Sequence, residues 1–390
     1  MRRKAIGLAR RFCNSLSMGQ PHPEAVAEAL TQPGPELSSE PLYVKLRDWI
    51  DDCKTNHRLC EKSWVEKGAV PDLPKRVLKI KFTAGTYAVT LLDVPGAGQY
   101  AALSHCWGSY QPLTTKKSNL SRRKNGIPWD KLPKTFQDAI VVTHGLGLEY
   151  LWIDSLCILQ DEDDKQDWIR EAAKMGSVYE NAWCTIAAVE GRDSRHGLFT
   201  QSDTIALTSE GSTSTSSEAP HHDLDDIISA YNDLPLFQRG WVLQERLLSR
   251  RVLYFCKREV IMECSTNIRC ECSGTHFQQV GLEGPSGPKY GGLRAQVQSA
   301  LHDLRAQTFQ RIFLRSLVPR PAEPRSMADF TLRTWDSVLE HYARRHLTHH
   351  SDRLPAISGI AKAFAQSGEL GRYWAGIWEA RAIESLLWNV

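Results

Sequence analysis

Short apolar runs alternate with amphipathic stretches between Tyr100 and Ala188. The runs at 100–104, 150–153 and 184–188 are too short for helices, and their composition favours buried strands. The stretches between them, 132–147 and 167–182, carry apolar residues at helical spacing. In the second stretch, one helical face carries Trp168, Ala172, Met175 and Tyr179. The order β-α-β-α-β predicts parallel strands with helices packed on the sheet.

The first predicted helix, 132–147, has start and stop signals of its own. Pro133 suits the first turn, and Thr135 with Asp138 is typical of a capping box. Gly145 and Gly147 are expected to end the helix.

Further elements flank this alternation. Residues 42–60 predict an amphipathic helix, and two strands at 76–80 and 87–92 should meet around the turn Ala84-Gly85. A helix at 241–248 should precede a hairpin of 251–255 with 260–264. Two further helical patterns follow Pro324, at 335–347 and 354–367. The fold class that these patterns predict is α/β, a parallel sheet core with flanking helices and a small hairpin region.

Composition shifts divide the chain into five parts. We predict a disordered basic and proline-rich segment (1–40), a helix and hairpin subdomain (41–98), a central domain (99–280) with a flexible polar insertion (205–228), a linker (281–325) and a C-terminal helical region (326–390).

Composition and charge exclude several classes of protein. The 390 residues are 42% hydrophobic and 24% charged, as in a globular protein of two or three domains. A net charge of +3 gives no argument for nucleic acid, and no apolar run approaches the length of a membrane span. The ten cysteines are scattered, which is typical of a reduced intracellular protein. The basic N-terminus suits either a disordered tail or a mitochondrial presequence, and we expect a cytoplasmic protein.

Polar residues follow two of the predicted strands. Ser104 and His105 come at the end of the first strand, and Asp154 and Cys157 follow the second. Because ligands bind outside the carboxyl ends of parallel strands, these side chains should surround one crevice.

Four motifs carry a resemblance to a known family. They are "YAALSHCWG", "LPKTFQDAI", "YLWIDSLCILQDEDDKQDWIREAAKMGSVYENAWCTIAA" and "RGWVLQERLLSRRVLYF". In this order and spacing, over about Tyr100 to Cys264, the chain resembles the heterokaryon-incompatibility (HET) domain of filamentous fungi. The resemblance implies a role in non-self recognition and regulated cell death, a form of innate immunity. It also implies self-association or other incompatibility proteins as partners.

The HET family is thought to be related to Toll/interleukin-receptor (TIR) domains, which are flavodoxin-like parallel sheets. Some TIR domains cleave NAD with a glutamate in a Trp-x-x-x-Glu segment of a helix. The resemblance therefore implies a flavodoxin/TIR-like core, with NAD as a substrate and no bound cofactor. Here Trp241 and Glu245 stand at that spacing, while His105 stands where many HET domains have tyrosine.

Glu245 is the first catalytic candidate. Its carboxylate can stabilise the positive charge that develops on a ribose as nicotinamide leaves; the alternative is a buried ion pair with Arg239 or Arg246. Asp154 can bind a ribose hydroxyl or cap the following helix. Trp107, Trp152 and Trp241 can stack on a nucleobase or belong to the core. The predicted ligand-binding set is Ser104, Trp107, Asp154, Arg239 and Trp241.

Cys157 is a second catalytic candidate, as a nucleophile with His105 or His144 as its base. A buried structural cysteine is the alternative. A nucleophilic Cys157 or Cys106, with a histidine as its base, would make the protein a biosynthetic enzyme on the same fold. A third alternative is a signalling adaptor without chemistry.

Two groups of residues have some metal-binding character. The first is Cys53, His57 and Cys60, and the second is Cys264, Cys270, Cys272 and His276. Neither repeats a clean C-x-x-C pair, so we assign no metal site from the sequence.

Overall fold

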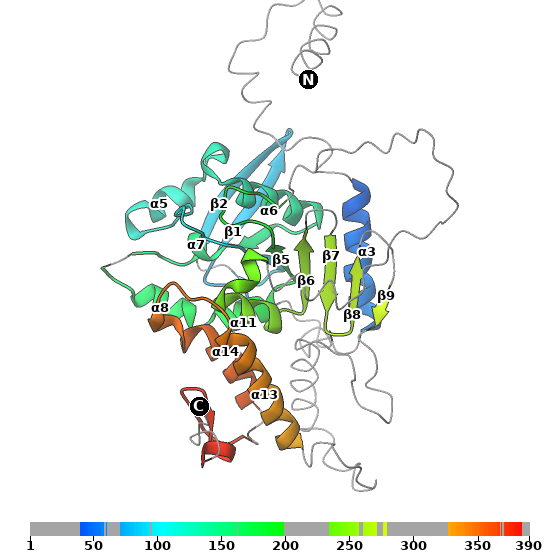
Figure 1. Ribbon diagram of the computed structural model, residues 1–390. Helices are drawn as coiled ribbons and strands as arrows, with labels where there is room; N and C mark the ends of the chain where they lie inside the picture. Colours follow the sequence, from blue (N-terminus) through cyan, green and yellow to red (C-terminus); the bar gives the residue numbers. More distant parts are fainter. Residues whose placement is uncertain are drawn as a thin grey trace, which may run out of the picture. The chain divides into compact units, whose positions relative to one another are not determined.

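In the part of the chain that the structure describes, nine strands form one mixed sheet in the order β2-β1-β4-β3-β5-β6-β7-β8-β9 (Figure 1). The chain is represented by a computed structural model. It describes residues 40–57, 60, 71–93, 96–161, 163–198, 234–256, 260–270, 276–278, 327–366, 368 and 370–383. The predicted segment before Glu40, the insertion at 205–228 and the linker at 281–325 lie outside the described residues.

The centre of the sheet is parallel. Its four strands are β4 (Tyr150–Trp152), β3 (Tyr100–Ser104), β5 (Cys184–Ala188) and β6 (Arg251–Phe255). The prediction that the first three are adjacent and parallel is confirmed, and so is the α/β class. Every residue of β3, β5 and β6 is buried, which explains why these strands are almost continuously apolar.

Antiparallel strands extend both edges of this centre. On one side lie β1 (Arg76–Thr83) and β2 (Thr86–Asp93); on the other lie β7 (Val260–Cys264), β8 (Asn267–Cys270) and β9 (His276–Gln278). Both predicted hairpins form, and each continues the central sheet, because β1 pairs with β4 and β7 with β6. Ala84 and Gly85 both have positive φ, which suits the two-residue turn between β1 and β2.

Helices connect and cover these strands. The longer ones are α3 (Glu40–Asn56), α5 (Lys117–Asn125), α6 (Lys134–Gly145), α11 (Gly240–Leu248), α13 (Met327–Ala343) and α14 (Pro355–Ala365). The short ones are α7 (Asp154–Cys157), α8 (Gln166–Ala172), α9 (Met175–Asn181), and the 3-10 turns η2 (Trp129–Lys131), η3 (Pro235–Gln238), η4 (His350–Asp352) and η5 (Glu379–Arg381).

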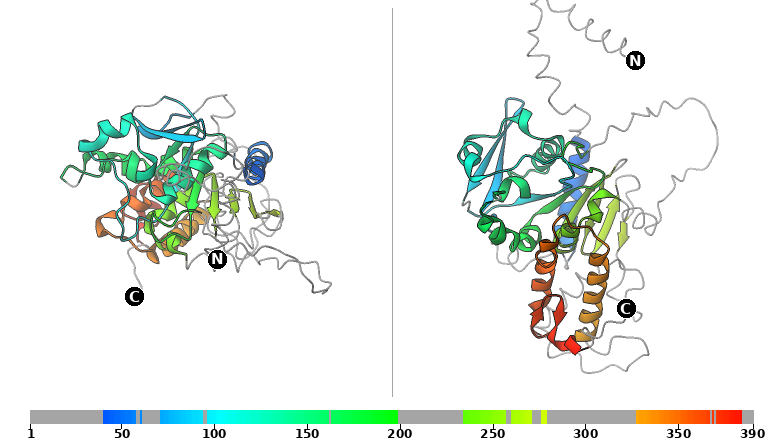
Figure 2. Two further views of the ribbon diagram at one scale, coloured as in Figure 1. Left: turned by 90° about the horizontal axis from the view of Figure 1, so that it is seen from above. Right: turned by 60° about the vertical axis from the view of Figure 1, so that its left-hand side comes forward.

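The chain crosses from β3 to β4 in one direction and from β4 to β5 in the other. Right-handed crossovers therefore place α6 and α9 on opposite faces of the sheet. Helix α11 packs against both α9 and α14. Helices α13 and α14 lie side by side (Figure 2), joined by the rings of Trp335 and Phe364. A two-stranded sheet, β10 (Tyr373–Trp374) with β11 (Ile377–Trp378), packs on Trp335.

The predicted capping box at the start of α6 is wrong. The helix begins after Pro133 without a side-chain cap. Instead, Thr135 Oγ1 accepts a hydrogen bond from Gly197 N at 3.0 Å, and Asp138 Oδ2 accepts one from Leu198 N at 2.9 Å. The backbone N–H of Thr135 donates to Ser194 O. The segment 194–198 thus accepts a hydrogen bond from a backbone N–H group of the first turn. The side chains of Thr135 and Asp138 bond this segment and do not cap the helix.

One predicted helix ends earlier than its pattern suggested, and another divides into two. The pattern at 42–60 gives a helix that ends at Asn56. The pattern at 167–182 divides into α8 and α9, because the two halves have different partners. Asp167 of α8 pairs with Arg76 of β1, whereas Gly176 of α9 lies so close to Gly359 of α14 that an added Cβ would meet its Cα at 2.8 Å.

None of the helices in the described ranges is both long and apolar enough to cross a membrane.

Candidate functional site

A buried carboxyl group lies at the carboxyl end of the parallel strands. Glu245 projects from α11 and is 5% exposed. The hydroxyl of Ser104, the last residue of β3, donates a hydrogen bond of 2.5 Å to Glu245 Oε2. The hydroxyl of Tyr179, from α9, donates a hydrogen bond of 3.0 Å to Leu103 O and lies beside the Glu245 carboxyl group. Strand β3 and helices α9 and α11 therefore meet at this one carboxyl group.

Burial raises the pKa of Glu245 from 4.5 to about 7. The hydrogen bond from Ser104, the charge of Arg239 and the neighbouring Tyr179 hydroxyl lower the pKa, while the charge of Asp154 raises it. Burial outweighs the stabilising groups, so this carboxyl group exchanges its proton near neutral pH. Such a pKa suits a group that acts in a reaction at physiological pH.

We expect Glu245 to make the folding stability depend on pH. In the unfolded chain it loses its proton near 4.5, and in the folded protein near 7. Between these values the unfolded state binds fewer protons, so stability falls as the pH rises. Glu245→Gln has no proton to lose. The variant should gain about 2–3 kcal/mol over the wild type between pH 5 and pH 8.

Urea unfolding of both proteins at several pH values measures this difference. The burial of His105 lowers its pKa from 6.5 to about 4 and acts in the opposite direction, but it is present in both proteins and cancels. Parallel stability profiles for the two proteins would contradict the assignment of a raised pKa to Glu245.

Asp154 orders the polar groups at the end of the neighbouring strand. It is the first residue of α7, and its Oδ1 accepts a hydrogen bond of 2.7 Å from Ser155 N. Its Oδ2 accepts one of 2.8 Å from Trp107 Nε1. His105 Nδ1 lies 3.9 Å from Oδ1, and the His105 ring packs edge-on against Phe136. Asp154 thus serves both its own helix turn and the loop after β3.

Two features of this cluster could take part in binding a ligand: an unbonded histidine nitrogen and two half-buried side chains. Within the described ranges, the buried Nε2 of His105 has no hydrogen-bond partner. Trp107 and Arg239 are only half-buried and lie at the solvent edge of the cluster. Arg239 precedes α11 and donates from its guanidinium to His105 O at 2.8 Å. Its positive charge is therefore held beside the end of β3.

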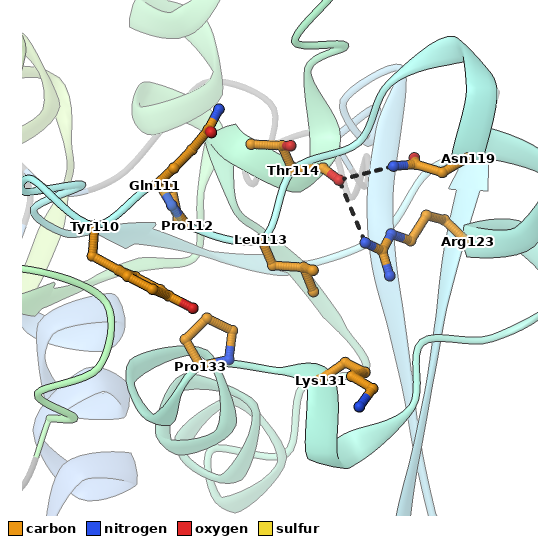
Figure 3. A pocket seen from close by; sticks show the side chains of 9 residues that line it. All are labelled: Tyr110, Gln111, Pro112, Leu113, Thr114, Asn119, Arg123, Lys131 and Pro133. Carbon is orange, nitrogen blue, oxygen red and sulfur yellow. Dashed lines mark hydrogen bonds between the residues drawn. The ribbon is translucent and has the colours of Figure 1, made fainter.

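An open pocket of about 320 Å³ borders the loop that follows Trp107 (Figure 3). Tyr110, Leu113 and Pro133 supply apolar walls, and Arg123 and Lys131 supply positive charge. Arg123 also bonds Thr114 O. Glu245 does not line this pocket. The loop after β3 thus contributes both to the buried cluster and to an exposed hollow.

In a comparison with known protein families, residues 100–245 match the family model described as "Heterokaryon incompatibility protein (HET)". These residues form a HET domain. The match begins at the first residue of β3 and ends at Glu245. Searches of the curated proteins and of the solved structures found no match.

The buried cluster is therefore part of the HET domain. Ser104, His105, Asp154, Tyr179 and Glu245 all lie within the matched residues. Ser104, His105, Asp154 and Glu245 were candidates from the sequence, and the structure brings these four together around two strand ends. Tyr179 was not a candidate, because in the sequence it was only part of an apolar helix face. The sequence did contain a signal for Tyr179: it places a hydroxyl on an otherwise apolar helix face, and a buried tyrosine needs a hydrogen-bond partner for its hydroxyl.

Cys157 lies in the HET domain but makes no hydrogen bond to either proposed histidine base within the described residues. Its thiol is buried, and burial raises its pKa from 9.0 to about 12. In the described part of the chain no hydrogen bond joins it to His105 or His144, and the His144 ring packs against Phe82 and Tyr87. The geometry therefore favours a structural cysteine.

Trp241 and Glu245 share α11 but serve different neighbours. Trp241 Nε1 donates to Asp352 Oδ2 at 3.1 Å, and its ring meets Trp168 edge-on. Arg246, the other proposed ion-pair partner of Glu245, pairs with Glu263 at 3.2 Å. Trp241 thus joins α11 to α8, within the HET domain, and to η4, outside it, and its contacts are those of a packing residue.

Proposed function

We propose that this HET-domain protein acts in heterokaryon incompatibility and regulated cell death. We further propose that it acts by cleaving NAD at the buried cluster around Glu245. The match to the family model supports the biological role. The observation that carries the chemistry is the Glu245 carboxyl group, buried at the carboxyl ends of parallel strands and hydrogen-bonded to Ser104. The relation of HET domains to TIR domains supports NAD as the substrate.

The proposed step is hydrolysis of the N-glycosidic bond of NAD. The bond between ribose C1′ and the nicotinamide nitrogen breaks, and its electron pair leaves with neutral nicotinamide. The ionised Glu245 carboxylate stabilises the positive charge that develops on the ribose. Water then attacks C1′ and loses a proton, so that the products are ADP-ribose, nicotinamide and one proton.

Neighbouring side chains suit the remaining parts of such a substrate. Asp154 can accept a hydrogen bond from a ribose hydroxyl, and the unpartnered Nε2 of His105 can bond a second one. The half-buried Trp107, held by Asp154 at 2.8 Å, can stack on the nicotinamide ring. Arg239 can pair with a phosphate. The cluster is buried, so Trp107 and its loop would have to move for NAD to enter.

Incubation of the purified chain with NAD tests this proposal. We expect the wild type to release nicotinamide and ADP-ribose in equal amounts, measured by liquid chromatography with mass detection. Glu245→Gln should reduce the rate by about 10²–10³, the usual effect of removing one group that stabilises transition-state charge. The rate should rise with pH through about 7, as Glu245 loses its proton.

Glu171→Gln is the matched control, because Glu171 is also a buried carboxylate but lies on α8 and pairs with Lys174. It should cleave NAD at the wild-type rate. Equal turnover by the wild type and Glu245→Gln, or none by the wild type, would overturn the enzymatic proposal.

A further inference from the structure

Four potential metal ligands from two distant parts of the chain meet in one buried cluster. They are Cys53, His57, Cys60 and Cys264, and their ligand atoms all lie within 4.8 Å of one another. The three cysteines are fully buried and His57 is 8% exposed. No pair of them forms a disulfide, since all three cysteines are free. Three thiols and one imidazole at this separation are a Cys₃His ligand set.

The end of α3 produces the first three positions. Cys53 lies in the last turn of α3, and His57 N still donates to Cys53 O at 3.2 Å. The helix ends at Asn56, and Cys60 N donates to His57 O at 2.9 Å. This turn brings the Cys60 sulfur back toward Cys53. The early end of the helix is thus what lets three closely spaced ligands converge on one point.

The fourth position comes from the sheet. Cys264 is the last residue of β7, and its Sγ lies 3.3 Å from His57 Nδ1. The backbone N–H groups of Thr266 and Asn267 point at the same sulfur, at 3.5 Å and 3.2 Å. Such N–H groups stabilise a thiolate, which is the form of cysteine that binds metals.

The surroundings complete a metal site in two further ways. His57 presents Nδ1 to the sulfurs, and its Nε2 lies 3.7 Å from Asp52 Oδ2. A carboxylate on the second ring nitrogen is the usual outer partner of a histidine that binds a metal. The guanidinium of Arg251 donates to Cys53 Sγ at 3.2 Å. Three thiolates and one divalent ion would have a net charge of −1. The positive charge of Arg251 lies against this site and would balance it.

We propose that Cys53, His57, Cys60 and Cys264 bind one structural zinc ion. A tetrahedral zinc with Zn–S bonds of about 2.3 Å places its sulfurs about 3.8 Å apart, a small contraction of the present cluster. With four protein ligands no position is left for water or substrate, so the ion is structural. The ion would join α3, which precedes the HET domain, to β7, the strand next to β6 in the sheet.

Metal analysis of the purified full chain is the first test. We expect about one zinc per chain by plasma mass spectrometry. X-ray absorption at the zinc edge should find three sulfur neighbours and one nitrogen neighbour, a result that needs no variant. A purified protein without zinc, or a zinc surrounded mainly by oxygen and nitrogen, would overturn the proposal, the second result indicating an adventitious ion only.

Variants test which residues hold the ion. Cys60→Ser/Cys264→Ser should lose most of the zinc. His57→Gln should also lose zinc, whereas His57→Cys should keep it, because Cys₄ is an equally good structural set. This rescue separates loss of a ligand from general unfolding.

The matched control is Cys270→Ser/Cys272→Ser, which removes the two other cysteines that the sequence grouped with Cys264. It should keep its zinc. Zinc lost from this control but kept by Cys60→Ser/Cys264→Ser would show that the ion sits elsewhere and would overturn the proposed ligand set.

Discussion

Overexpression of the Glu245→Gln variant in a filamentous fungus should leave cells viable under conditions in which the wild-type protein kills them. The variant keeps the shape of the side chain and an oxygen that can accept the hydrogen bond from Ser104. It cannot supply a negative charge to a developing cation, so the proposed reaction stops while the fold remains. Because the buried charge is gone, the melting temperature near pH 8 should equal or exceed that of the wild type.

Glu245→Asp separates charge from position. It retains the charge but withdraws the carboxylate by one methylene from Ser104 and Tyr179. We expect it to fail as well, because transition-state stabilisation depends on placement within a fraction of an ångström. Viability counts and melting curves of both variants, with Glu171→Gln as the control that still kills, give the measurement. If Glu245→Gln is folded and kills at the wild-type level, the enzymatic proposal is wrong and the protein is better described as a signalling adaptor.

The largest expected loss of stability comes from Arg76→Met. Arg76 is buried on β1, forms an ion pair with Asp167, and donates from Nε to Cys157 O at 2.7 Å. The partner carboxylate is buried too and accepts a hydrogen bond of 3.0 Å from Leu159 N. Removing the guanidinium leaves this charge with less compensation. We expect a loss of about 3–5 kcal/mol in the free energy of unfolding, measured with urea.

Two controls define the cause. Lys75 also contacts Asp167, at 2.9 Å, but its side chain is 35% exposed. Lys75→Met should therefore cost less than about 1 kcal/mol. The double variant Arg76→Met/Asp167→Leu removes both charges and should recover much of the loss. If the double variant is no more stable than Arg76→Met, the cost lies in packing around Arg76 and not in a stranded charge.

The central sheet could be predicted from the amino-acid sequence alone. Fully apolar runs such as 184–188 predict strands buried on both faces, and the helical patterns between them require parallel crossovers. The same order placed Ser104 and Asp154 at neighbouring strand ends. These inferences succeeded because burial on a strand or a helix imposes a local period that can be counted along the chain.

Which polar groups meet depends on the folded arrangement of distant segments and could not be predicted from local sequence. Ser104 and Glu245 are 141 residues apart, and nothing in the local spacing joins them. The choice of Cys264 as the fourth member of the α3 cluster is of the same kind. Thr135 and Asp138 have capping-box spacing, yet they bond a returning segment. In each case a buried polar group bonds the donor or acceptor that packing brings to it, and packing depends on the whole chain.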